Sequence, residues 1–314
     1  MEKTRLGSLL GILLSILWGV SFLSIKVAVV EIPPMTMAVY RFAIACAILP
    51  FMARLGKEPL KVPPRDLLVL ALGGFTGVTL YFYGENHGVA LLTASESSLV
   101  VSFIPVLAVV ADRVLLGVRI SAKVWMGAIL STLGVFLIFA RSAGTSSSRQ
   151  GYLYMLVACG AWVAYGLVTR DVAKRHGIWT TSFWQCLFGL AGCVPFALTE
   201  SARWRMPGAT AFWNLLYLGL ACSAAAYWLY IASLNLLGPA VAAIFINVIP
   251  VVSVSASYLF LGERLNALQL LGGAVVVAGV FLATGSRGRS GGGSEGLEEG
   301  QGTRVQGARA GCAE

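Results

Sequence analysis

One arginine, Arg41, lies in an otherwise uncharged stretch between Pro34 and Pro50, seven residues after the first proline and nine before the second. An ionised side chain inside an apolar helix is costly, so we expect it to have a function. The guanidinium group suits a carboxylate or phosphate, because its donors match two oxygens at once. Arg41 is therefore predicted to bind an anionic group of a solute, or else to form a structural ion pair with Glu85 or Glu96.

Four more ionisable side chains border or enter apolar stretches. Lys26 lies near the end of the first stretch, where its ammonium group either reaches the membrane surface or faces a solute. Glu85 and His87 end the third stretch and Glu96 begins the fourth. Histidine exchanges protons near physiological pH, and carboxylates in apolar surroundings can also do so. We expect Glu85, His87 and Glu96 either to carry a coupled proton or to be solvated at the membrane surface.

Aromatic rings recur through the apolar stretches. They suit an amphipathic or aromatic solute, or a cation held over a ring face, whereas packing and lipid contact explain most single rings. Trp18 and Trp162 are exceptions because they recur at equivalent positions, 144 residues apart (162 − 18). The predicted solute-binding residues are Trp18, Lys26, Tyr40, Arg41, Tyr81, Tyr83, Trp162, Tyr165, Tyr227 and Asn247.

Pro105 and Pro250 are each expected in the middle of a predicted helix. Proline removes a backbone hydrogen bond and clashes with the preceding turn, so each should kink its helix and act as a hinge. Asn247 precedes Pro250 by three residues and shares its helical face, where it would satisfy freed backbone groups or contact a solute.

Motifs of catalytic or metal-binding chemistry are missing from the sequence. It has no H-E-x-x-H, G-x-S-x-G or P-loop pattern, and only two histidines, His87 and His176. None of the six cysteines has C-x-x-C spacing, so neither a zinc site nor a disulfide framework is indicated. We therefore expect no enzyme, no metal and no cofactor.

The elements that must position these residues are membrane-spanning helices. The chain is 57% hydrophobic and 12% charged, with a mean hydropathy of +0.80, whereas soluble domains are about a quarter charged. Several uncharged stretches are long enough to cross a ~30 Å hydrocarbon core. The predicted spans are 6–27, 34–53, 67–85, 94–113, 122–140, 151–170, 179–198, 211–234, 239–261 and 265–284. The fold class is thus an all-α membrane protein with ten transmembrane helices.

The same short motifs occur twice in the same order. The first series is Ile104-Pro105-Val106, Leu116-Gly117-Val118-Arg119 and Gly134-Val135-Phe136-Leu137. The second series, 145 residues later (250 − 105), is Ile249-Pro250-Val251, Leu261-Gly262-Glu263-Arg264 and Gly279-Val280-Phe281-Leu282. Internal duplication in a membrane protein is typical of transporters. Since five helices per repeat is an odd number, the two repeats are predicted to be inverted relative to each other.

Basic residues favour one orientation in the membrane. The chain carries a formal net charge of +9. With the N-terminus in the cytoplasm, fourteen Lys and Arg fall in cytoplasmic segments and five on the far side, leaving aside Lys26, Arg41 and the distal tail. The positive-inside rule then places both termini in the cytoplasm. Membrane orientation accounts for the basic balance, so no nucleic-acid partner is implied.

Together these motifs resemble the EamA family of the drug/metabolite transporter superfamily. The resemblance rests on Trp18-Gly19, Lys26, Tyr40-Arg41-Phe42, the repeated prolines, the Leu-Gly-x-Arg motifs and the Gly-rich final helix of each repeat, over about residues 6–284. It implies a ten-helix transporter of a small organic solute. The first repeat departs from the pattern at Val118, opposite Glu263. The second has Gln185 opposite Arg41 and Arg170 opposite Lys26, which predicts a cavity asymmetric in charge.

These observations combine into one hypothesis. Residues 6–140 and 151–284 form two EamA-like repeats, 141–150 a linker, and 285–314 a disordered cytoplasmic tail. The protein is expected in the plasma membrane, exporting an amino acid or related metabolite by alternating access, as a monomer or homodimer in contact with the lipid bilayer. The alternatives are a nucleotide-sugar or drug carrier of the same fold, or a membrane-embedded enzyme or scaffold without transport.

Overall fold

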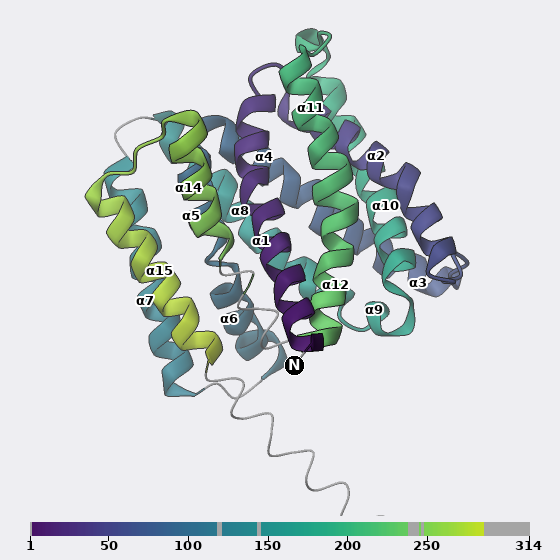
Figure 1. The fold of residues 1–314 in the computed structure, drawn as a ribbon, viewed down its shortest axis with the longest axis horizontal. Helices are drawn as coiled ribbons and strands as arrows, with labels where there is room; N and C mark the ends of the chain where they lie inside the picture. The colour runs from purple at the N-terminus through teal and green to yellow at the C-terminus, as the bar shows by residue number, and fades with distance from the viewer. Residues whose placement is uncertain (1, 118–120, 143–145, 238–244, 246–247, 286–314) are drawn as a thin grey trace, which may run out of the picture.

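The computed structural model describes residues 2–117, 121–142, 146–237, 245 and 248–285, and all regular secondary structure in this part of the chain is helical (Figure 1). The apolar stretches form these helices because a backbone inside a membrane must satisfy its own hydrogen bonds. The uninterrupted long helices are α1 (Glu2–Ala28), α2 (Pro34–Leu55), α7 (Ala122–Ser142), α8 (Ser146–Thr169), α10 (Ile178–Thr199) and α15 (Ala267–Gly285).

Two spans contain a π-helix in the middle. The third span consists of α3 (Pro64–Gly74), η1 (Phe75–Leu80) and α4 (Tyr81–Leu91), with η1 as the π-helix. The eighth consists of α11 (Ala209–Tyr217), η3 (Leu218–Ala225) and α12 (Ala226–Leu237), with η3 as the π-helix. The two π-helices start 143 residues apart (218 − 75). π-helical turns widen the backbone locally and occur frequently at functional sites.

The fourth span is interrupted rather than kinked. It consists of α5 (Ala94–Val101) and α6 (Ile104–Leu116), and Pro105 lies in the first turn of α6. Pro250 likewise lies in the first turn of α14 (Ile249–Leu261). Most of residues 238–247, directly before this helix, lie outside the described part of the chain. The first turn accommodates proline because the missing amide has no intrahelical partner there. Two short helices, α9 (Val172–Arg175) and η2 (Ser201–Arg203), lie in connections between spans.

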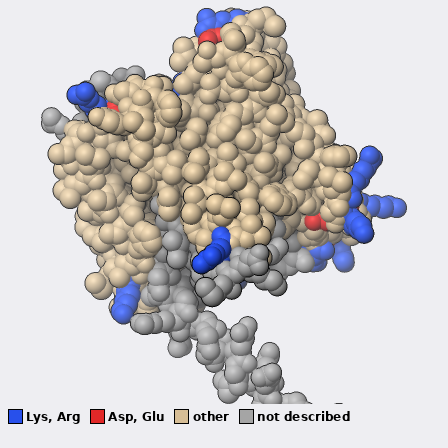
Figure 2. Space-filling model, viewed as in Figure 1, with Lys and Arg blue, Asp and Glu red and all other residues tan. Residues whose placement is uncertain are grey.

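Six of the helical segments are long and apolar enough to cross a membrane. Four shorter apolar helices fall at the remaining predicted spans, at Ala122–Ile138, Ala209–Ala225, Ile249–Leu261 and Ala267–Leu282. Charged side chains lie around the margins of the face in Figure 2, and its broad middle is uncharged. Large apolar side chains such as Leu9, Phe51 and Phe136 are exposed on this bundle, which fits a lipid-facing surface.

Helices from the two halves of the chain pack in pairs. α7 lies along α15, α2 packs against α10, α4 packs against α8, and α1 packs against α12 and α14 (Figure 1). The α7–α15 contact is close because glycines face the opposite backbone, as Gly134 faces the Gly272 carbonyl. The core therefore lies between the two halves, with few contacts that remain within one half.

Two predicted boundaries differ from the structure. The third span continues to Leu91, so Glu85 and Asn86 are buried inside α4 and do not lie at a solvated helix end. Glu85 accepts a hydrogen bond from Tyr81 there, and Asn86 donates one through Nδ2 to the Pro34 carbonyl, although its Oδ1 has no partner among the described residues. Helix α8 begins at Ser146, within the stretch predicted as a linker. The predicted tail beyond Gly285 lies outside the described residues.

Candidate functional site

Arg41 is buried in α2, with 7% of its surface exposed. Its Nε donates a 2.8 Å hydrogen bond to the hydroxyl of Ser223, in the π-helix η3. The guanidinium carbon lies 4.5 Å from the ring centre of Phe82, a cation–π contact. In the described part of the chain this guanidinium forms no ion pair. An arginine held by one hydroxyl and an aromatic face keeps donors for an anionic ligand.

Next to this arginine, α4 contributes a carboxyl–phenol pair. The Tyr81 hydroxyl donates a 2.8 Å hydrogen bond to Oε1 of Glu85, which is 4% exposed. The Tyr81 ring lies 4.9 Å from the Trp162 ring of α8. Phe82, the ring beneath Arg41, is 4.9 Å from Tyr81. The structure thus brings Tyr81 and Trp162 into the neighbourhood of Arg41.

Trp18 contacts the same π-helix from α1. Its indole Nε1 donates a 3.2 Å hydrogen bond to the carbonyl of Cys222, the residue before Ser223. Tyr217, which directly precedes η3, donates a 2.8 Å hydrogen bond to the carbonyl of Leu17. α1 and η3 are therefore tied together beside the Arg41 partner. Sequence reasoning did not single out Ser223, which looks like one small polar residue among many.

A second aromatic pair, Trp162 and Tyr165, lies on α8. Tyr165 packs its ring 5.2 Å from Trp162 and donates a 3.1 Å hydrogen bond to Oε1 of Gln185. Gln185 is the residue that stands opposite Arg41 in the repeat comparison. The structure consequently brings Tyr165 to Gln185, a second polar position, on α10.

Lys26 is engaged with the backbone. Its Nζ donates to the carbonyls of Val89 (3.0 Å), Ala90 (3.3 Å) and Leu92 (2.5 Å), at the C-terminal end of α4. A cation is favourable there because the last carbonyls of a helix carry partial negative charge. The half-buried ammonium group is thus bound at the end of α4 and does not join Arg41.

Two other predicted residues are not brought to this centre, and the side chains of two more are not described by the structure. Tyr40 is 45% exposed, since it is adjacent to Arg41 and points to a different side of α2. Tyr83 packs against His87 (4.6 Å between ring centres) and Tyr154 (5.7 Å) near one end of the bundle. The Tyr227 side chain and all of Asn247 lie outside the described residues.

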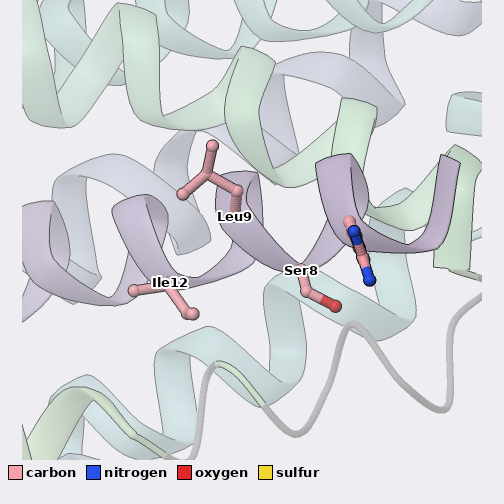
Figure 3. A pocket seen from close by; sticks show the side chains of 4 residues that line it. Ser8, Leu9 and Ile12 are labelled. Carbon is pink, nitrogen blue, oxygen red and sulfur yellow. The ribbon is translucent and has the colours of Figure 1, made fainter. Parts of the chain in front are cut away.

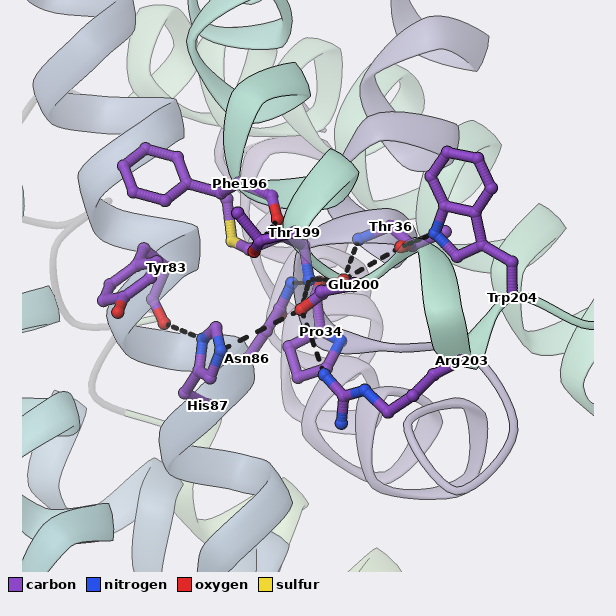
Figure 4. A network of polar contacts seen from close by, with 11 residues as sticks. Pro34, Thr36, Tyr83, Asn86, His87, Phe196, Thr199, Glu200, Arg203 and Trp204 are labelled. Atoms are coloured by element: carbon purple, nitrogen blue, oxygen red, sulfur yellow. Dashed lines mark hydrogen bonds and ion pairs between the residues drawn. The ribbon is translucent and has the colours of Figure 1, made fainter.

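That end of the bundle carries a buried carboxylate, Glu200, which sequence reasoning missed (Figure 4). Glu200 follows α10, is 5% exposed, and accepts hydrogen bonds from the amides of Met35 and Thr36 and from the Thr36 hydroxyl. We call this end of the molecule the Glu200 face. From the sequence alone, a glutamate directly after an apolar span is expected to be solvated. A carboxylate is nevertheless a good cap for the free amides at the start of a helix, and this is the role that Glu200 has.

His87 and Arg203 both turn toward Glu200 (Figure 4). His87 Nε2 is 4.0 Å from Oε1 of Glu200, and Arg203 Nη2 is 3.6 Å from the same oxygen. His87 Nδ1 lies 2.8 Å from the Tyr83 carbonyl, so Nδ1 carries a proton and donates it. Nε2 then meets the carboxylate favourably only when the ring is protonated.

The opposite end, which we call the Glu58 face, has a tighter cluster of the same composition. Asp66, near the start of α3, accepts from Arg175 Nη2 at 2.7 Å and lies 2.8 Å from His176 Nε2. Glu58 accepts from the Thr180 amide at 3.0 Å and so caps α10. The two histidines of the chain therefore each face a buried carboxylate, one at either end of the bundle.

Glu96 and Glu263 hold the start of α5. Glu96 accepts from Thr93 in a capping box and also from Tyr152 (2.9 Å) and Gln269 (2.5 Å). Glu263 accepts from the amides of Ala94 and Ser95 and from the Ser95 hydroxyl. Glu85, His87 and Glu96 consequently lie in three different environments, and no hydrogen bond among the described residues joins any two of them.

Two of the surface cavities are lined by described residues. One of about 440 Å³ lies at the Glu200 face, and its walls are Val29, Val30, Glu31, Pro33, Ala202, Arg203, Trp204 and Arg205. Another of about 300 Å³ lies along the first half of α1, where Arg5, Ser8, Leu9 and Ile12 line it (Figure 3). Among the described residues, no group of histidine, cysteine and acidic side chains could hold a metal ion.

The model of the EamA-like transporter family matches residues 5–140 and again residues 149–285. The chain belongs to this family. It is thus a membrane transporter protein of the drug/metabolite transporter superfamily, as its sequence motifs predicted, and its EamA domain is present twice. The family and its named members are transporters and not enzymes.

Relatives of this EamA protein are similar along most of their length. An uncharacterized transporter of Archaeoglobus fulgidus is 27% identical over 86% of this chain and 95% of its own. YetK, an uncharacterized transporter of Bacillus subtilis, is 26% identical over 82% of this chain and 80% of its own. A probable amino-acid metabolite efflux pump of Salmonella typhimurium is 23% identical over 89% of this chain and 95% of its own.

The fold is also seen in a solved structure. A protein crystal structure superposes with a TM-score of 0.62 at 20% identity, covering 88% of this chain and 98% of that one. At this identity the likeness concerns the fold alone.

Proposed function

We propose that this EamA protein is a secondary transporter that exports an amino acid or a related small metabolite across the plasma membrane. Arg41 carries the proposal, because it is a buried cation, two helical turns inside α2, whose described hydrogen bond uses Nε alone. A substrate carboxylate would complete it. The names of the Salmonella typhimurium and Escherichia coli relatives, probable amino-acid metabolite efflux pumps, support this substrate class.

Trp18, Tyr81, Trp162 and the other rings near Arg41 would enclose the rest of the substrate. Glu85 lies in the same region, hydrogen bonded to Tyr81. It would attract the ammonium group of an amino acid while Arg41 binds the carboxylate. A nucleotide-sugar carrier needs more than one free cation, and Lys26 is held by three backbone carbonyls, which favours the smaller substrate.

The proposed mechanism is alternating access between two inverted repeats of five spanning helices each. The corresponding motifs at a 145-residue spacing, the two π-helices and the pairing of helices across the halves support it. The interruption before Pro105, and Pro250 at the equivalent position, would be the hinges. The orientation with both termini in the cytoplasm puts the Glu200 face outside and the Glu58 face inside.

For proton coupling, His87 is the best candidate among the three residues predicted. Its free nitrogen faces Glu200, so protonation would draw α4 toward the end of α10 and close the outer face. Glu85 is a second candidate, because it is buried next to Arg41. Glu96 is engaged by Thr93, Tyr152 and Gln269, which supports a structural role.

The test is untargeted mass spectrometry of spent medium from cells that express the wild type, Arg41→Ala or Tyr40→Phe at equal membrane abundance. We expect a small set of amino acids or related carboxylates to rise with the wild type and with Tyr40→Phe, the neighbouring exposed residue. Export by Arg41→Ala should fall about 100-fold, the cost of losing one good charged pair of hydrogen bonds. Indistinguishable media would contradict export and favour a scaffold or an uptake system.

A further inference from the structure

Two buried polar atoms of α10 have no hydrogen-bond partner in the described structure: Oγ1 of Thr181 and Nε2 of Gln185. The two residues are 6% and 4% exposed. They are four positions apart, so they lie on the same face of the helix. Buried donors without partners are rare in native proteins, because each has given up its bonds to water. Two such donors on one face indicate a partner that binds in another state.

The surroundings show where that partner would bind. Tyr165 of α8 donates to Oε1 of Gln185 and so orients the amide. Nε2 then faces α3, where a methyl group built on Gly73 would come within 2.8 Å of it and within 2.6 Å of Thr169 Cγ2. The unpaired donors thus lie where α10 meets α3 and α8. Gly73 lets α3 pack directly against Gln185 and Thr169, so in this closed state the junction is filled and a ligand could reach the donors only when the Glu58 face opens.

The position is the counterpart of Arg41. Gln185 is seven residues after Ile178, the first residue of α10, and Arg41 is seven after Pro34, the first residue of α2. At a rise of 1.5 Å per residue, each lies about 10 Å from the start of its helix. α2 and α10 run in opposite directions, so Arg41 is nearer the Glu200 face and Gln185 nearer the Glu58 face. One half of the bundle therefore presents a cation and the other presents neutral donors.

We propose that Thr181 and Gln185 form a second subsite for the substrate carboxylate, occupied when the Glu58 face is open. The inference rests on the proposed transport of a carboxylate-bearing solute. Hydroxyl and amide groups hold a carboxylate less tightly than a guanidinium does. A solute that enters from the Glu58 face meets these donors first and then passes to Arg41. The asymmetry predicts weaker binding from the Glu58 face than from the Glu200 face.

The experiment uses Thr181→Val and Gln185→Leu, with Thr199→Val as the matched control. Thr199 is on the same helix, at its exposed end, and bonds only to its own turn. Uptake of an equimolar mixture of the twenty ¹⁴C-labelled L-amino acids is measured in inside-out and right-side-out membrane vesicles. Gln185→Glu is a further variant, since it keeps the shape and places a negative charge opposite the incoming carboxylate.

Thr181→Val and Gln185→Leu should each raise the half-saturating concentration about tenfold in inside-out vesicles and leave it within twofold in right-side-out vesicles. The Glu variant should raise it more, and Thr199→Val should change neither. Thr181→Val should also raise the Tm of the purified ligand-free protein, because it removes an unpaired buried hydroxyl, whereas Gln185→Leu also removes the acceptor of the Tyr165 hydroxyl.

Unchanged uptake by Thr181→Val and Gln185→Leu in vesicles where the wild type is active would overturn the subsite and leave the proposed function standing. A fall in Tm with Thr181→Val would also overturn it, since that hydroxyl would then be satisfied in the resting protein. If wild-type vesicles accumulate none of the amino acids, the proposed substrate class is wrong, and the subsite falls with it.

Discussion

Glu58 and Glu200 each follow one helix of an antiparallel pair and cap the N-terminus of the other. Glu200 follows α10 and binds the amides that begin α2, whereas Glu58 follows α2 and binds the Thr180 amide near the start of α10. A carboxylate at a helix N-terminus satisfies free amides and interacts favourably with the helix dipole. The two halves of the chain are consequently joined at both ends of this helix pair.

We expect the two caps to differ in strength. Glu200→Ala removes a buried carboxylate that binds the amides of Met35 and Thr36 and the Thr36 hydroxyl, so it should destabilise the protein by about 2 kcal/mol. Glu58→Ala removes one described hydrogen bond and should cost about 1 kcal/mol. Thermal unfolding in detergent, followed by tryptophan fluorescence, measures both. Equal effects would contradict the ranking.

A second prediction concerns the contact between α7 and α15. A methyl group on Gly279 would lie 2.6 Å from the Gly127 carbonyl oxygen, so Gly279→Ala should destabilise the protein by about 1–3 kcal/mol. Gly160→Ala is the control, because nothing lies within 4 Å of a methyl group there. That variant should be neutral or stabilising, since alanine favours helix. Unfolding by increasing SDS compares the two, and the idea fails if they unfold alike.

A third prediction concerns acid closure at the Glu200 face. His87 faces Glu200 and Arg203 from α4, with Tyr83 and Tyr154 around its ring. Protonation adds a charged Nε2–H that binds Glu200, so the ends of α4 and α10 should approach as the pH is lowered from about 7.5 into the acidic range. Electron paramagnetic resonance distances between spin labels at Leu91→Cys and Ala202→Cys, in a background without native cysteines, report this.

The two histidines provide the control for that measurement. His87→Gln should abolish the pH-dependent approach, because glutamine does not titrate. His176→Gln, at the opposite face beside Asp66, should leave it intact. A pH response that survives His87→Gln would assign it to another group.

The fourth prediction separates a structural Lys26 from a substrate-binding one. Lys26→Met removes the donor of three backbone carbonyls at the end of α4 and should cost about 2 kcal/mol of stability. The concentration of solute that half-saturates transport should stay within twofold. Lys61→Met, at an exposed position, is the control and should change neither quantity. A tenfold rise in the half-saturating concentration with unchanged Tm would instead place Lys26 in the substrate site.

Much of the architecture could be predicted from local pattern. The apolar stretches, the duplicated motifs and the isolated Arg41 are properties of consecutive residues, because a spanning helix must be apolar over its own length. The helical character, the membrane class and the family prediction were confirmed on that basis. A disturbance of the helix at Pro105 could be predicted from the chemistry of proline. A kink was expected, and the structure has a turn between α5 and α6.

Partners across the bundle could not be predicted. Arg41 and its partner Ser223 are 182 residues apart in the sequence, and Glu200 binds Thr36 from 164 residues away. Glu200 directly follows one apolar span and Lys26 lies just before the end of another, so both look solvated in the sequence. The structure instead buries Glu200 and holds Lys26 against backbone carbonyls.

The sequence by itself determined which segments are helical and which of them are apolar enough to span a membrane, since both depend on neighbouring residues. Only the tertiary structure decided which buried side chains satisfy one another and which, as at Thr181 and Gln185, remain unpaired. The reason is that helix packing sets distances between residues far apart in the chain, and no local pattern carries that information.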